Sequence, residues 1–205
     1  MTQFEIKDGV AIIPEGMTEI PFRAFINCED LTTVVIPDSV TCIVNAAFYG
    51  CSSLTEIVIP NSVTSIGAGA FSHCSSLKNI VIPNSVTQIG YNAFGFCTSL
   101  TNIVIPNGVT SIGDKAFCCS SFMRRLVIRN IRKLVTENET TTVKNASSLT
   151  SVTLPESLTE LGKDVFLSCE KLETIYVPTT KANFYREHLP ETLHDKIVEF
   201  EPEQK

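Results

Sequence analysis

Cysteine and histidine are the residues of this chain whose chemistry could support catalysis or metal binding, and their spacing decides whether they can cooperate. The chain has eight cysteines. Metal sites and dithiol motifs need pairs that are two to four residues apart, and the five cysteines of the main column have no such pairs. We therefore expect these five to be buried thiols that act as small apolar side chains. The column contains Cys28, Cys51, Cys74, Cys97 and Cys169.

Disulfides within this column are also not expected. Repeats that stack by strand pairing lie about 4.8 Å apart, which is within disulfide range, but side chains in a parallel column point the same way. Cys42 and the adjacent Cys118 and Cys119 fall outside the column. Ser120 stands where the column expects a cysteine, and one of the adjacent pair is a candidate to replace it.

The histidines do not complete a catalytic group. They are His73, His188 and His194. A Cys/His nucleophile needs hydrogen-bond reach and an orienting third group, whereas the side chains of His73 and Cys74 are expected to point apart. The sequence shows no phosphate loop, paired-acid motif or metal signature. We expect no catalytic residue, no cofactor and no metal. A thiol-dependent redox protein is a remote alternative, because the chain has several cysteines.

The residues around the cysteines repeat every 23 positions. Residues 59–81, IPNSVTSIGAGAFSHCSSLKNIV, are followed in register by IPNSVTQIGYNAFGFCTSLTNIV. A fixed period of this length predicts one elongated solenoid, in which the repeated apolar positions stack as a continuous core. The next position of the proline column is Arg129. Pro155 fits the same column only if three residues are inserted before it, and we place this insertion within residues 136–142. The regular prolines are Pro14, Pro37, Pro60, Pro83 and Pro106.

Each repeat should contain two strands and a short third segment. Alternation at Ile80 and Ile82 predicts one strand, and the stretch 63–66 predicts a second, shorter one. The pattern Gly-x-x-Ala-Phe-x-x-Cys reads as a single helical turn or a 3₁₀ segment. In the column of the second strand, Val135 is expected between Ile112 and Leu161.

Three regions follow from this pattern. Residues 1–13 are expected to form a capping hairpin around an Asp-Gly turn. Residues 14–178 form the solenoid, with an irregular turn at about 124–149. Residues 179–205 form a second cap and tail, with a short helix from Ala182 to Leu189 that Pro190 ends, and an apolar strand from Ile197 to Phe200. Caps are needed because the end repeats otherwise expose core side chains and strand edges.

The repeated pattern Leu-x-x-Ile-x-Ile-Pro-x-Ser-Val-Thr-x-Ile-Gly-x-x-Ala-Phe-x-x-Cys resembles the BspA-type, or Treponema-type, leucine-rich repeat family over roughly residues 10–178. The carboxy-terminal stretch is similar to the cap of such proteins from Bacteroidetes. The resemblance implies an α/β repeat solenoid, a curved right-handed superhelix with a parallel concave sheet. It also implies non-enzymatic protein binding or adhesion by bacterial proteins that are secreted or held at the cell surface.

Composition limits the partners. The chain is 43% hydrophobic, and its formal net charge of -6 argues against nucleic acid. No apolar stretch approaches the roughly 20 residues that cross a bilayer, so membrane insertion is not expected. No signal peptide is recognised at the amino terminus, which also leaves a cytoplasmic location open.

The sheet surface is the expected binding site for an unidentified protein or peptide. If the isoleucines of the first strand point inward, alternation places one apolar row outward and a polar row beside it. The alternative explanation is that valine only stabilises the sheet by cross-strand packing. The apolar row contains Val35, Val58, Val81, Val104, Val127 and Tyr176, with Thr153 between the last two, and the polar row includes Glu56, Asn79, Asn102 and Arg125.

A basic cluster in the irregular turn is the second candidate. It contains Arg124, Arg125, Arg129, Arg132 and Lys133 in an otherwise acidic chain. Such a cluster suits an acidic patch on a partner, although a solvated face is the alternative. We expect a monomeric binding module, and the other function considered is a structural spacer or a self-associating building block.

Overall fold

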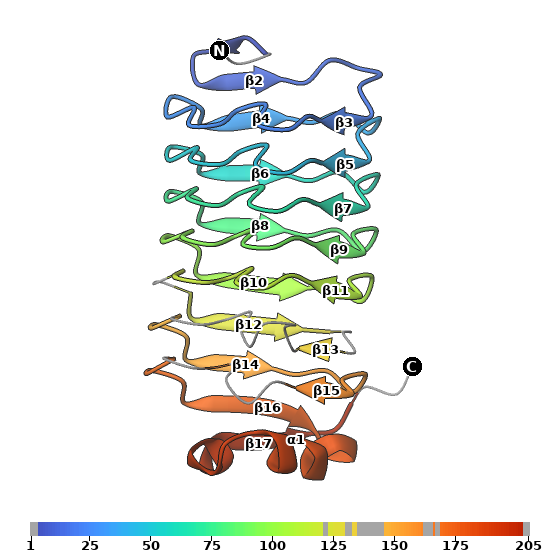
Figure 1. The fold of residues 1–205 in the computed structure, drawn as a ribbon, viewed down its shortest axis with the longest axis vertical. Helices are drawn as coiled ribbons and strands as arrows, with labels where there is room; N and C mark the ends of the chain where they lie inside the picture. Colours follow the sequence, from blue (N-terminus) through green and yellow to red (C-terminus); the bar gives the residue numbers. More distant parts are fainter. Residues whose placement is uncertain are drawn as a thin grey trace.

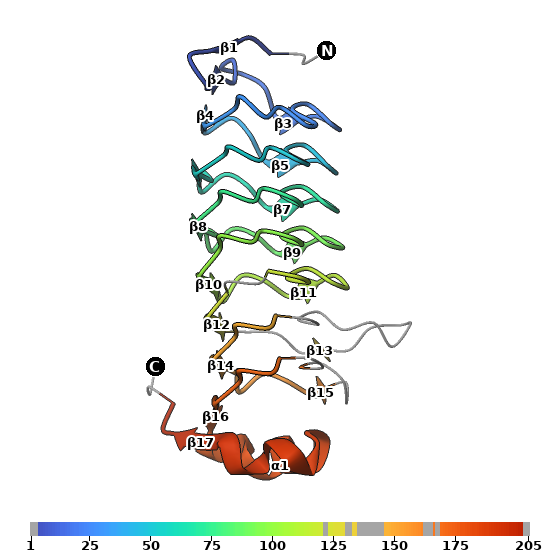
Figure 2. The ribbon, with the colours of Figure 1, turned by 90° about the vertical axis from the view of Figure 1, so that its left-hand side faces the viewer.

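The computed structural model is one elongated stack of coils (Figure 1). It describes residues 4–120, 123–129, 146–161, 166 and 169–202, together with the backbone of 133–134. Each coil, one turn of the solenoid, places a long strand and a short strand on different sides, and the stack axis is nearly straight in both views (Figures 1 and 2). The fold is a parallel β-solenoid, as the 23-residue period predicts.

The long strands run parallel along one side of the stack. Formal strand pairing is interrupted between β4 and β6 and between β8 and β10. Backbone hydrogen bonds still cross these gaps, from Thr55 N to Thr32 O at 3.3 Å and from Thr101 N to Lys78 O at 3.4 Å. The strands are β2 (Val10–Ile12), β4 (Thr33–Val35), β6 (Glu56–Val58), β8 (Asn79–Val81), β10 (Asn102–Ile105), β12 (Arg125–Ile128), β14 (Ser151–Thr153) and β16 (Thr174–Pro178).

The short strands form a second set of parallel ladders. In β13 and β15 the register pairs Leu134, not Val135, with Leu161. The expectation that Val135 occupies this column is therefore wrong, because the sixth coil reaches its short strand one residue early and the insertion follows. The strands are β3 (Glu19–Ile20), β5 (Cys42–Ile43), β7 (Ser65–Ile66), β9 (Gln88–Ile89), β11 (Ser111–Ile112), β13 (Lys133–Leu134) and β15 (Glu160–Leu161).

The segment that joins the short strand to the next long strand is a ladder of turns. The expectation of a helical turn or 3₁₀ segment is wrong for the described coils. In the third coil, Ala70 N bonds locally to Gly67 O at 3.2 Å, whereas Phe71 N bonds to Ala93 O of the next coil at 2.8 Å. Local hydrogen bonds and hydrogen bonds to the next coil alternate in this way through His73. The segment is therefore not a helix, in which every amide would bond within its own segment.

A stack of phenylalanine rings runs through the core. Each ring has no exposed surface, and neighbouring ring centroids lie 5.2 to 5.7 Å apart. Phe4 closes the amino-terminal end, with its centroid 5.1 Å from that of Phe25. Buried isoleucine, leucine and alanine columns surround the rings. The stacked rings are Phe25, Phe48, Phe71, Phe94 and Phe117.

Both ends of the stack are covered. At the amino terminus β1 (Ile6–Lys7) pairs antiparallel with β2, and Asp8 and Gly9 both have positive φ, as a tight Asp-Gly turn requires. At the carboxy terminus α1 (Ala182–His188) lies across the last coil, with Tyr185 fully buried. The chain then passes through a 3₁₀ segment at Glu191–Lys196 and ends with β17 (Ile197–Phe200), which pairs parallel with β16.

Candidate functional site

Four of the five column thiols are buried structural groups, whereas Cys28 in the first coil is partly exposed, so the expectation of burial is wrong for that residue. The thiols of Cys51, Cys74 and Cys97 are buried, and each donates a hydrogen bond to a phenylalanine carbonyl of the preceding coil at 3.0 to 3.2 Å. Burial raises the pKa of Cys51 and of Cys97 to about 12, and that of Cys169 to about 11. Buried thiols with a raised pKa are poor nucleophiles because the thiolate is the reactive form.

Ser120 occupies the column position itself. Its side chain is fully buried, and its hydroxyl donates to Phe94 O at 3.1 Å, as Cys97 does to Phe71 O. The expectation that Cys118 or Cys119 replaces it is therefore wrong. A hydroxyl can make the same bond to the carbonyl, so the column does not require sulfur.

The histidines take part in packing and in the cap. The His73 ring stacks on Phe96, with centroids 4.4 Å apart, and lies 5.2 Å from Tyr49. In the carboxy-terminal cap, a ring nitrogen of His188 and one of His194 contact the carbonyls of Phe184 and Leu189. Within the part of the chain that the structure describes, no three His, Cys, Asp or Glu residues gather in a way that could hold a metal ion.

The outward row of the long strands is a continuous ladder of mostly apolar side chains. Strand register aligns its members wherever adjacent strands are paired. Val58 and Val81 keep 79% and 78% of their surface exposed, although both lie in the middle of the stack. The exposed members are Ile12, Val35, Val58, Val81, Val104, Tyr176 and Val198, and Val127 and Thr153 are partly buried. We call this row the apolar ladder.

The ladder extends beyond the residues predicted for it. Ile12 pairs in register with Val35 at one end, and Val198 pairs with Tyr176 at the other. Val198 lies 22 residues after Tyr176, so the 23-residue period does not find it. Ile12 lies 23 residues before Val35, and extending the column by one repeat is the signal that could have identified it.

Polar and basic side chains lie beside the apolar ladder. Glu56, Asn79, Asn102 and Arg125 are exposed on the same strands, one row away. Arg124 and Arg129, which flank β12, are exposed as well. These three arginines therefore lie along β12, which carries Val127, the sixth of the nine positions of the ladder. Arg132 and the side chain of Lys133 lie outside the described residues.

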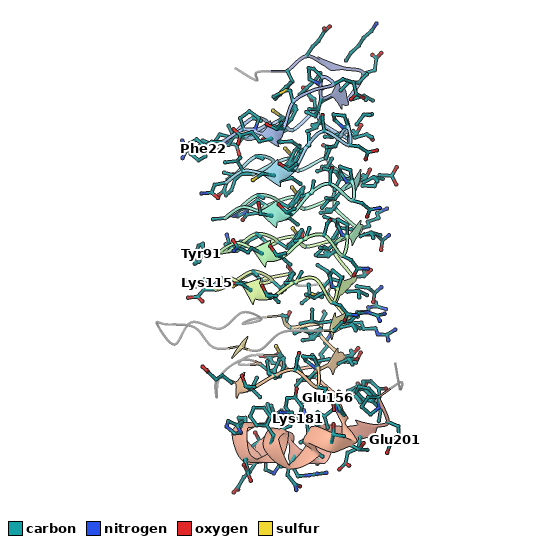
Figure 3. All side chains as sticks on the ribbon, turned by 90° about the vertical axis from the view of Figure 1, so that its right-hand side faces the viewer. Phe22, Tyr91, Lys115, Glu156, Lys181 and Glu201 are labelled. Carbon is teal, nitrogen blue, oxygen red and sulfur yellow. The ribbon has the colours of Figure 1, made fainter. Side chains whose placement is uncertain are left out.

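The turn edge has no comparable surface. Phe22, Tyr91 and Lys115 project from the side of the stack away from the long strands (Figure 3). Phe22 and Tyr91 are 57% and 49% exposed, but Asn45 and Ala68 stand between them in the same column. The exposed aromatic residues of this column are thus separated by positions with a polar or a small side chain, and the stack of His73 on Phe96 beside it spans only two coils.

The short-strand side holds a shallow groove. This groove is lined by Gly67, Gly90 and Gly113 and by the side chains of Ser65 and Gln88. The glycines allow close contact between coils, because a Cβ atom on Gly90 would lie 2.4 Å from the Ala68 nitrogen. This surface offers neither a charged cluster nor an apolar row, so the long-strand side is the best candidate site.

Comparison with known families identifies the repeat. The family described as "BspA type Leucine rich repeat region" matches residues 10–124 and 70–189, with six copies of the repeat. The chain belongs to the BspA-type leucine-rich repeat family. Proteins with leucine-rich repeats of this type are generally binding modules without enzymatic activity. No curated protein matches the chain.

Solved structures share the BspA-type fold. The leucine-rich repeat protein TpLRR of T. pallidum is 30% identical, with a TM-score of 0.73 over 87% of this chain and 82% of TpLRR. The pneumococcal vaccine antigen PcpA is 19% identical, with a TM-score of 0.75 over 97% of this chain and 48% of PcpA. A leucine-rich repeat protein from Bacteroides ovatus is 19% identical, with a TM-score of 0.52 over 94% and 92% of the two chains. In the described part of this chain, no helix is both long enough and apolar enough to cross a membrane.

Proposed function

We propose that this chain is a non-enzymatic module that binds a protein partner through the long-strand side. The observation that carries the proposal is the apolar ladder, which is exposed at Val58 and Val81 and continues through both caps. A contiguous apolar surface with a polar rim is typical of protein interfaces. Here the rim is the row that includes Glu56, Asn79 and Asn102.

Sheet stability alone does not account for the ladder. Cross-strand packing favours β-branched residues, but threonine is also β-branched and suits a strand. The chain places Thr153 in this same row, in register with Val127 and Tyr176. The valines at positions 58 and 81 therefore keep apolar surface in water where a polar β-branched residue would fit.

Charge indicates the chemistry of the partner. Arg124, Arg125 and Arg129 are exposed on and beside β12, within the ladder, whereas the chain as a whole carries a net charge of -6. Complementary charge at an interface raises the association rate and fixes orientation. We therefore infer that the partner is a protein with an apolar strip and an acidic patch beside it, opposite β12.

The family relationship supports a setting for this binding. Adhesion to a host or bacterial surface, by a secreted or surface-held protein, is the role that the BspA-type resemblance suggests. A spacer or self-associating building block is the other function to test. It predicts that the ladder contacts a second copy of this chain, which would make the apparent size depend on concentration.

The double variant Val81→Glu, Val104→Glu tests the proposal. Two carboxylates in the apolar ladder must be desolvated on binding, so we expect the partner affinity to fall by about tenfold or more. The wild type and the variant are used in parallel to capture proteins from host and bacterial extracts, and each captured protein is then purified and titrated. The matched control is the double variant Gln88→Glu, Ser111→Glu, which adds the same two negative charges to the exposed, paired positions of β9 and β11 on the short-strand side.

The outcomes separate the candidate functions. A purified partner that binds the folded double variant as tightly as the wild type contradicts the proposal. Concentration-dependent dimers in size-exclusion chromatography that are lost in the double variant support self-association instead. The companion variant Arg125→Glu should weaken binding and flatten its salt dependence, because the acidic patch then meets a like charge.

A further inference from the structure

Two adjacent cysteines on the turn edge of the fifth coil have their thiols in direct contact. The Sγ atoms of Cys118 and Cys119 lie 3.0 Å apart. Cys118 is 7% exposed, whereas Cys119 is partly exposed to solvent. Cys119 is therefore the residue of the pair that solvent reaches, and the Cys118 sulfur lies directly beside its sulfur.

The backbone holds this pair in a defined position. Cys119 has a φ of 59°, and it follows His73 and Phe96 in a column of the turn ladder whose members all have positive φ. Cys118 O accepts a hydrogen bond from Phe96 N at 2.8 Å, and Cys118 N donates to Lys115 O at 2.9 Å. Hydrogen bonds at the backbone nitrogen and at the backbone oxygen of Cys118 thus fix the turn that carries the two thiols.

The column thiols are in a different situation. Cys51, Cys74 and Cys97 are buried, and each donates to a backbone carbonyl. Oxidation of a thiol follows its accessibility and thiolate character. A solution oxidant should therefore react at Cys119 before it reaches Cys51, Cys74 or Cys97.

We propose that Cys118 and Cys119 form a reversible oxidation site, at which a hydroperoxide converts the dithiol to a disulfide between neighbouring residues. The Cys119 sulfur attacks the outer oxygen of hydrogen peroxide, which forms the sulfenic acid and releases water. The Cys118 sulfur then attacks the sulfenic sulfur, and the S–S bond forms as a second water leaves. In total the two thiols lose two protons and two electrons, and the peroxide is reduced to two waters.

Geometry predicts that this bond is easily reduced. Consecutive Cα atoms are 3.8 Å apart across a trans peptide, which is closer than the usual separation of about 4.4 to 6.8 Å across a disulfide. Strained and exposed disulfides have higher reduction potentials than structural ones. The pair therefore suits a switch that small thiols reset, and not a permanent crosslink. This inference does not depend on the proposed binding face, which lies on the long strands.

Peptide mass spectrometry tests the proposal. Trypsin releases residues 116–124, AFCCSSFMR, which contain these two cysteines and no other. Folded protein is treated with hydrogen peroxide and then alkylated in denaturant before digestion. We expect this peptide to lose two hydrogens and to resist alkylation, and a small dithiol reductant should restore two alkylation sites. Cys28 and Cys42, which are also partly exposed, serve as internal controls and should form no intramolecular disulfide.

Two single variants make the result decisive. Cys118→Ser and Cys119→Ser should each abolish the loss of two hydrogens. A trivalent arsenical that bridges two thiols should label the 116–124 peptide of the folded wild type but not that of either variant. Double alkylation of the oxidised wild-type peptide, over-oxidation to sulfinic acid without a disulfide, or a disulfide that joins Cys119 to a second molecule would each overturn the proposal.

Discussion

Phe71→Ala is expected to lower the free energy of unfolding by about 3 to 5 kcal/mol, as large-to-small core substitutions do. The Phe71 ring is fully buried between Phe48 and Phe94, whose centroids lie 5.2 and 5.4 Å away. Removal of the ring leaves a cavity that the coils above and below cannot fill, because their backbones are tied together by hydrogen bonds such as Phe71 N to Ala93 O.

Equilibrium unfolding in urea measures this loss. The matched control is Phe96→Ala in the adjacent coil, because Phe96 is 38% exposed and stacks on the exposed His73 ring. We expect that control to cost about 1 kcal/mol or less. Equal losses in the two variants would show that the phenylalanine stack is not the main source of cohesion between coils.

Alkaline pH is expected to destabilise the protein steeply. Burial raises the pKa of Cys51 and Cys97 to about 12 and places that of Cys74 well above the ordinary value for a thiol. Below about pH 9 both the folded and the unfolded states keep these protons. Between about pH 9 and 12 the unfolded state releases them and the folded state does not, so stability falls as the pH rises. Each thiol contributes about 1.4 kcal/mol per pH unit, or about 4 for the three together.

The triple variant Cys51→Ser, Cys74→Ser, Cys97→Ser isolates this effect. Ser120 shows that a hydroxyl fits the column and makes the same bond to a phenylalanine carbonyl. Urea unfolding from pH 8 to 11 in the presence of a phosphine reductant should give a much flatter pH profile for the variant. The buried Tyr185 hydroxyl, whose pKa burial also raises, leaves some slope above its ordinary pKa of about 10. Parallel profiles for the two proteins would contradict the burial of the column thiols.

The core was predictable from the sequence because the period gives it directly. Once 23 residues separate Phe48, Phe71 and Phe94, stacking requires them to share one interior position. The turn ladder was not predictable in the same way. The partner of Phe71 N is Ala93 O in the next coil, and a local sequence window cannot reveal a hydrogen bond between coils. The Ala-Phe-Cys spacing consequently resembles a helical turn.

Breaks in the period limited the other predictions. Leu134 takes the place expected of Val135, because the short strand of the sixth coil comes one residue earlier than the 23-residue period predicts. Only the pairing of Leu134 with Leu161 reveals this shift. The outward orientation of Val58 and Val81 followed from strand alternation, which the exposures of these side chains confirm. Val198 was missed because it joins the ladder through strand register and not through the repeat. Ile12 lies one full period before Val35, and it was missed because the column was not extended into the amino-terminal cap.

A photoreactive amino acid at position 81 tests the binding face most directly. Position 81 lies in the middle of the apolar ladder on β8, and position 88 lies on β9 on the other strand set. After irradiation with the captured partner, the account predicts a covalent adduct from the protein that carries the probe at 81 and none from the protein that carries it at 88. An adduct from position 88 without one from position 81 would contradict the claim that the long strands form the binding site.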